Sequence, residues 1–381
     1  MRDTIGTADE LHASATKLTG LDDFGDDGYR EGLGVLLDSL ARDAALTPLG
    51  NTIWRADLRG TLVARLLTEA AWRQHPAYAD VPVERPIFVT GLSRTGTTAL
   101  HRLLAADPAH QGLEVWLTDV PQPRPPRDTW PDNPIYQRIQ AGYARHHAEN
   151  PEYAGVHFIS ADSVEECWRL LRQCLTSVSY ECLAHVPAYS RWLAAQDWTG
   201  AYARHRRTLQ LTGLPDAGKR WVLKNPSHLF ALDALLAVYP DALVIQTHRD
   251  PRTAIASTCS LSLASTTGWS TGFTPEVIGR SQLDLWSRGL EAFTAARARH
   301  DPARFYDVQY DDFVADPLGA VASIYSYFGL ELSAPARTAM EDLNKQSQTG
   351  VRRPRHRYTL SDFALTAEDV TDSFGMARSA E

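Results

Sequence analysis

Leucines recur at three- and four-residue intervals through the first 80 residues of the chain. They form two sets, Leu33, Leu36, Leu37 and Leu40, then Leu58, Leu62, Leu66 and Leu67. This spacing places apolar side chains on one face of a helix. We therefore predict that residues 1–80 form an N-terminal helical layer that packs on the rest of the chain.

After Val81-Pro82 the pattern changes to short apolar runs separated by longer segments with helical spacing. Four runs have the length of buried strands, at residues 87–89, 221–223, 243–245 and 305–308. Helices are expected at about 97–106, 228–239, 252–263, 276–300 and 317–329. This alternation predicts an α/β domain over residues 81–381, in which helices flank a parallel sheet. A mostly helical insertion, about residues 134–212, separates the first two runs, where it can build a pocket over the strand ends.

Composition narrows the class of protein and its partners. Hydrophobic residues make up 44% of the 381 positions, and no apolar run approaches the roughly 18 residues of a membrane helix. The N-terminus leads into no apolar signal core, so we expect a cytoplasmic protein without a membrane span. The formal net charge of -8 argues against a nucleic-acid partner. The four cysteines lack the spacing of zinc ligands or of a disulfide framework. The oligomeric state cannot be read from the sequence.

The segment from Pro86 to Leu104 joins an apolar run, a glycine-containing loop and a helical run. Gly91 and Gly96 allow the backbone to turn tightly, so that successive N–H groups point at an anion. The helix that follows adds its partial positive charge. Thr97 and Thr98 supply hydroxyls. The segment therefore predicts a site for a nucleotide phosphate.

The type of nucleotide is narrowed by what the loop lacks. A Walker loop has a lysine directly after its last glycine and a hydroxyl on magnesium. Here Thr97 follows Gly96, and the cation, Arg94, precedes it. No apolar run ends in an aspartate suited to magnesium. We therefore expect a site for one terminal phosphate that uses no metal.

Two motifs resemble sulfotransferases that use 3′-phosphoadenosine-5′-phosphosulfate (PAPS). Residues 91–98, GLSRTGTT, resemble the loop that holds the 5′-phosphosulfate. Residues 243–257 resemble the 3′-phosphate segment, in which Arg-Asp-Pro follows a strand and Ser257 lies eight residues after Arg249. The resemblance implies a P-loop-like fold and PAPS as donor. It assigns the 5′ end to Arg94, Thr95, Gly96, Thr97 and Thr98, and the 3′-phosphate to Arg249 and Ser257.

The resemblance is strongest to a bacterial group with a helical N-terminus. Arg94 stands where cytosolic members carry lysine, although tyrosylprotein sulfotransferases also carry arginine there. Residues 308–317 resemble the segment whose tyrosine, here Tyr310, packs near the adenine. The basic stretch 352–358 lies where the family places a loop over the 3′-phosphate, which suggests Arg353 and Arg355 as ligands. Ordinary solvated charge is the alternative interpretation of that stretch.

Three residues are candidates for the chemistry. Lys224 ends an apolar run, and the matching lysine of the family contacts the bridging or transferred sulfate oxygens. The resemblance to tyrosylprotein sulfotransferases suggests Glu114 as general base. A glutamate between Leu113 and Val115 is expected to be partly buried, which raises its pKa. His157 is the rival base, because cytosolic sulfotransferases use histidine.

The hypothesis is a sulfotransferase that moves a sulfuryl group from PAPS to a hydroxyl of a small-molecule or lipid acceptor. Arg94 and Lys224 would stabilise charge, Glu114 would take the acceptor proton, and no metal is required. One alternative is a P-loop small-molecule kinase, which needs ATP and magnesium. A second is a nucleotide-binding module that has lost catalysis. The acceptor itself cannot be identified from the sequence.

Overall fold

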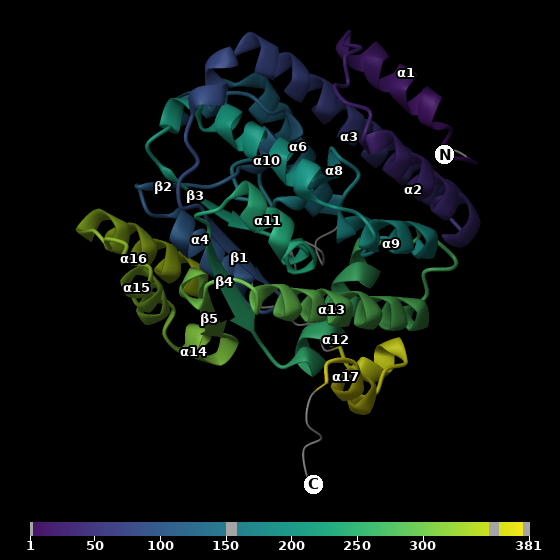
Figure 1. Cartoon of the computed structure of the whole chain (residues 1–381). Coiled ribbons are helices and arrows are strands. Elements are labelled where there is room, and N and C mark those ends of the chain that lie inside the picture. Colours follow the sequence, from purple (N-terminus) through teal and green to yellow (C-terminus); the bar gives the residue numbers. More distant parts are fainter. Residues whose placement is uncertain (1–2, 150–157, 350–357, 376–381) are drawn as a thin grey trace.

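A five-stranded parallel sheet forms the centre of the molecule (Figure 1). The computed structural model describes residues 3–149, 158–349 and 358–375. The strand order is β2-β3-β1-β4-β5, and every pair is parallel. The strands are β1 (Ile87–Gly91), β2 (His110–Gln111), β3 (Arg220–Lys224), β4 (Leu243–His248) and β5 (Phe305–Gln309). The predicted parallel α/β fold is thus confirmed.

The four apolar runs all form strands, as predicted. The edge strand β2 was not predicted, because two residues carry no recognisable period. The prediction of one continuous helix at 228–239 is wrong. The segment is divided into the 3-10 helix η5 (Pro226–Phe230) and α11 (Leu232–Val238), because Ala231 between them adopts φ −146° and ψ 43°.

Helices cover both faces of the sheet, so alternate strand residues enter two different cores. Ile87 and Val89 belong to one core with Leu100 and Ile324, whereas Phe88 belongs to the other. The first core is closed by α4 (Thr97–Ala105), α15 (Pro317–Tyr327) and α16 (Ala334–Thr349). The second is closed largely by α10 (Thr199–Thr212), α11 and α13 (Pro275–Arg297).

The N-terminal helices share the second core with the sheet. They are α1 (Ala8–Thr19), α2 (Tyr29–Asp43) and α3 (Pro48–Gln74), and Leu36 and Leu66 of this layer are fully buried. Arg65 of α3 is only 1% exposed. Its guanidinium donates to the carbonyls of Phe24 and Gln173 at 2.6 and 2.9 Å. A buried cation with such partners joins the N-terminal layer to the insertion.

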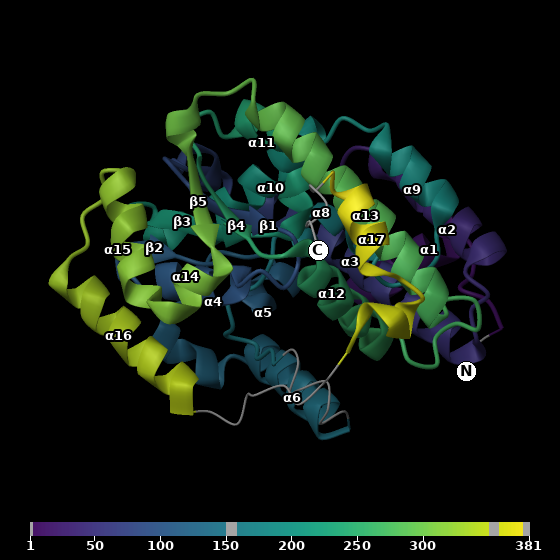
Figure 2. The same cartoon turned by 90° about the horizontal axis from the view of Figure 1, so that it is seen from below.

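The insertion holds α6 (Pro134–Glu149), α8 (Trp168–Arg172), α9 (Pro187–Ala194) and α10. Figure 2 shows the side of the molecule on which α12 (Pro251–Ser265) and α17 (Ala367–Ser373) lie. The remaining helices are α5 (Val115–Asp119) and α14 (Tyr310–Ala315), with short 3-10 turns between elements. In the described part of the chain, no helix combines the length and apolar character that crossing a membrane requires. The cytoplasmic location stays a prediction.

We expect Gly50→Ala to destabilise the protein, because α3 packs too closely on the loop after α12 for a methyl group. A Cβ at Gly50 would lie 1.9 Å from the carbonyl oxygen of Trp269. The cost should be about 1–3 kcal/mol of unfolding free energy, as for other overpacked sites. Urea unfolding followed by circular dichroism measures it.

Gly60 on the same helix is the matched control, because a Cβ there meets nothing within 4 Å. Gly60→Ala should leave the midpoint unchanged or raise stability by up to about 1 kcal/mol, since alanine favours helix more than glycine. Equal midpoints for the two variants would contradict the close contact between α3 and Trp269.

Candidate active site

The loop at residues 91–98, here called the phosphate loop, contains two glycines whose backbone lies very close to neighbouring residues. Gly91 ends β1 at φ 140°, and a Cβ there would lie 2.5 Å from the carbonyl and hydroxyl oxygens of Thr247 on β4. Gly96 has φ 88°, and a Cβ would meet the Tyr310 ring at 3.2 Å. Arg94 between them also has a positive φ, of 69°. A left-handed conformation is costly for arginine and typical of functional loops.

The helix after the loop presents free donors toward it. Gly96 is the N-cap of α4 and provides no side-chain cap, so the first N–H groups of the helix remain open to an anion. The Thr95 hydroxyl donates to the Leu92 carbonyl at 2.7 Å and lies 2.5 Å from the Thr247 hydroxyl. It therefore holds the loop together. Thr97 is buried at the start of the helix.

Arg94 and the start of α12 meet, as the two-phosphate hypothesis requires. Arg94 Nε donates to the hydroxyl of Ser257 at 3.1 Å. The same hydroxyl accepts from Tyr358 at 2.6 Å. Arg249 donates to the Arg94 carbonyl at 2.9 Å. The segments predicted for the 5′ and 3′ ends of the donor are thus in direct contact.

Tyr310 completes this group from the start of α14. The guanidinium carbon of Arg249 lies 4.0 Å from the centre of the Tyr310 ring, a distance typical of a cation–π contact. Tyr310 also borders Gly96. A planar aromatic surface therefore lies beside both the phosphate loop and Arg249.

Lys224 forms a second cluster at the end of β3. Its side chain is 3% exposed and makes an ion pair with Glu166. It also donates to the Thr98 hydroxyl at 3.1 Å, at the start of α4. Cys167, next to Glu166, donates its N–H to the Lys224 carbonyl. Two opposite charges and a hydroxyl therefore converge where the phosphate loop becomes a helix.

Glu166 was missed by the sequence interpretation. Burial raises the pKa of its carboxyl group, while the charge of Lys224 acts in the opposite direction. The only local signal was the pair of adjacent glutamates, Glu165-Glu166. Neither regular spacing nor a motif connects that pair to the loop at residues 91–98.

Glu114 is buried, as expected, but is bound elsewhere. It is 6% exposed, and burial raises its pKa against the opposing charge of Arg124. Its carboxylate lies 3.1 Å from Arg124 Nε. Arg124 also binds Asp216 and Gln111 at 2.9 and 2.8 Å. The structure therefore brings Glu114 into an ion-pair network beside β2, whereas Lys224 pairs with Glu166.

Three predicted residues lie outside the described part of the chain, namely His157, Arg353 and Arg355. Tyr358, which directly follows the basic stretch, contacts Ser257. All four cysteines are free thiols. Within residues 3–149, 158–349 and 358–375, no three histidine, cysteine or acidic side chains are grouped as metal ligands.

Comparison with known proteins places this geometry in a family. A model of the sulfotransferase family matches residues 86–334. Sulfotransferase STF1 from Mycobacterium tuberculosis H37Rv is 61% identical, with a TM-score of 0.92 over 98% of this chain and 99% of that chain. Sulfotransferase STF9 from Mycobacterium avium is 28% identical, with a TM-score of 0.89 over 98% and 96%.

Curated relatives agree over a shorter region. Omega-hydroxy-beta-dihydromenaquinone-9 sulfotransferase Stf3 from Mycobacterium bovis and Mycobacterium tuberculosis is 26% identical over 272 residues. That alignment spans 66% of this chain and 64% of the relatives' length. Because the family model matches well over half of the chain and includes the phosphate loop, Lys224 and Arg249, this protein belongs to the sulfotransferase family.

Proposed function

We propose that this protein transfers a sulfuryl group from PAPS to a hydroxyl group of a small-molecule or lipid acceptor. The observation that carries the proposal is the contact between the phosphate loop and the Arg249–Ser257 segment, through Arg94. PAPS has phosphates at both ends of its ribose, and two adjoining groups of anion-binding residues fit such a molecule. The name of the curated relatives supports a hydroxyl acceptor on a lipid.

The donor would be held by the residues that the resemblance assigned. The open N–H groups of α4, with Arg94 and Thr98, would bind its 5′ end. Arg249 and Ser257 would bind the 3′-phosphate, with the Tyr310 ring beside them. Arg353 and Arg355 remain predictions of the sequence. PAPS supplies the activated sulfuryl group, so the protein must supply position, charge stabilisation and a base.

Glu166 is the base that the geometry favours. It forms an ion pair with Lys224, which also donates to the Thr98 hydroxyl at the phosphate loop, whereas Glu114 is bound to Arg124. When Lys224 turns toward an anionic oxygen, Glu166 loses its cation and its pKa rises further, which suits proton abstraction. Lys224 would then stabilise charge on the departing phosphate. Glu114 becomes a positioning residue for the segment before α5.

Nucleotide binding distinguishes the donor from that of a kinase. We expect 3′,5′-ADP, the product of PAPS, to raise the melting temperature, and Mg-ATP to have little effect. At 100 times the dissociation constant the stabilisation should be about 2.7 kcal/mol. Arg249→Ala should abolish most of the shift, because it removes a predicted ligand of the 3′-phosphate. Stabilisation by Mg-ATP alone would favour the kinase alternative.

Turnover tests catalysis and the identity of the base. Sulfur-labelled PAPS would be incubated with lipid and polar extracts, and labelled products separated by mass. Glu166→Gln should lower turnover at least about 100-fold, the usual worth of a general base, with 3′,5′-ADP binding retained. Glu114→Gln is the matched control. If Glu114→Gln loses turnover and Glu166→Gln keeps it, Glu114 is the base instead. If the wild-type protein binds 3′,5′-ADP but shows no turnover, it is a nucleotide-binding module without catalysis.

The pH profile provides an independent test of the Glu166–Lys224 pair. Glu166 must be ionised to act as a base, so the rate should fall tenfold per pH unit below its pKa. Burial raises that pKa above the ordinary glutamate value, and Lys224 lowers it in part. In Lys224→Met the remaining activity should therefore decline at a higher pH than in the wild type. An unchanged profile would show that another group titrates.

A further inference from the structure

A pocket of about 520 Å³ lies between α9 and α13. None of the residues assigned above to the donor or to proton transfer lines it. Its apolar lining is formed by Ala184, Val186, Pro187, Ala194 and Val277, and the other eight lining residues are polar or charged. Pockets of this volume with apolar walls and a few polar groups are typical of small-molecule sites.

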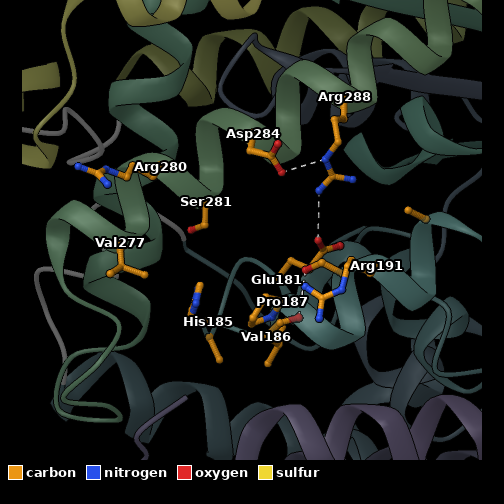
Figure 3. A pocket seen from close by; sticks show the side chains of 13 residues that line it. Glu181, His185, Val186, Pro187, Arg191, Val277, Arg280, Ser281, Asp284 and Arg288 are labelled. Carbon is orange, nitrogen blue, oxygen red and sulfur yellow. Dashed lines mark hydrogen bonds and ion pairs between the residues drawn. The ribbon is translucent and has the colours of Figure 1, made fainter. Parts of the chain in front are cut away.

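The floor of the pocket carries a nearly buried carboxyl group, that of Glu181. Glu181 is 7% exposed, and Figure 3 shows its carboxyl group pointing across the pocket toward Arg288. Arg288 Nη2 lies 3.6 Å from the carboxylate, too far for a hydrogen bond. Arg288 Nε instead binds Asp284 at 2.9 Å. Glu181 and Arg288 thus form an ion pair that is longer than a hydrogen bond.

The carboxyl group of Glu181 is nearly buried, and its partners are Arg288 and Ser190. Burial raises the pKa of Glu181 to about 7, and Ser190 and Arg288 offset this only in part. The carboxyl group therefore exists in both protonation states near neutral pH. Such a buried polar group gains most from a partner that can both donate and accept.

Charged side chains of both signs surround the pocket. Titratable groups from the segment before α9, from α9 and from α13 face it, namely Glu181, His185, Arg191, Arg280, Asp284 and Arg288. A ligand cation would meet the arginines, and a ligand anion would meet Glu181 and Asp284. A hydroxyl oxygen beside the gap can accept from Arg288 and donate to Glu181 at once.

We propose that this pocket is a second ligand site, for an uncharged apolar molecule whose hydroxyl group bridges Glu181 and Arg288. The site lies beside the catalytic cluster but is separate from it. Cys182, the next residue, is near enough to Glu166 and Cys259 for their charges to raise its pKa, in addition to the larger effect of burial. Glu181 lines the pocket, and Cys182 directly follows it in the sequence.

Photolabelling of the full chain tests the proposal. The probe is decanol carrying a diazirine on its chain, and labelled residues are mapped by mass spectrometry. Decanol can also enter the acceptor site, so the labelled residues show which of the two sites it occupies. We expect labels on α9 and α13. Ala194→Trp should reduce them at least tenfold, because Ala194 is an exposed residue that lines the pocket. Ala195→Trp is the matched control, since Ala195 is also exposed and does not line it.

Ligand chemistry is tested with matched probes and one further variant. Decanoic acid and decylamine with the same diazirine should label the pocket more weakly than decanol. Glu181→Leu should weaken labelling by decanol about tenfold, the usual effect of removing one hydrogen bond to a charged group. Stronger labelling by the amine or acid would overturn the hydroxyl assignment. Labels confined to the surroundings of Glu166 would overturn the pocket and leave the proposed sulfuryl transfer intact.

Discussion

The close packing of β1 against β4 at the phosphate loop is the constraint on which the rest of the site depends. Gly91 approaches Thr247 so closely that no side chain fits between them. This contact brings the loop after β1 beside the residues that follow β4. Arg249 can then bind the Arg94 carbonyl, and Arg94 can bind Ser257. In a parallel sheet, the carboxyl ends of neighbouring strands lie side by side. The residues that follow β1 and those that follow β4, both proposed to bind anions, therefore adjoin.

The residues proposed for catalysis lie on the other side of β1, where β3 ends. Lys224 enters a buried cluster with Thr98 and Glu166. Each member comes from a different part of the chain: Lys224 from β3, Thr98 from α4 and Glu166 from the insertion. The buried charges are held as a pair, since an isolated buried charge would be far less stable. The pair also sets the acidity of Glu166, which connects the fold to the proposed proton transfer.

Several elements were predictable because their determinants are local. A glycine-bounded loop between an apolar run and a helical run is a local signal for the proposed phosphate site, and four of the five strands have readable apolar patterns. Edge strand β2 was not predictable, because two residues carry no period. The division of the expected helix at Ala231 likewise depends on local backbone angles that the pattern does not reveal.

The sequence by itself determined the fold class, the position of the proposed phosphate loop, and the residues expected at the two ends of the donor. Each of these depends on short contiguous segments of the chain. Only the tertiary structure decided which carboxylate lies beside Lys224. Glu114 is buried and Glu166 is partly buried, and both have raised pKa values, but one faces Arg124 and the other Lys224. That difference depends on long-range packing of the insertion against β3, which no local spacing encodes.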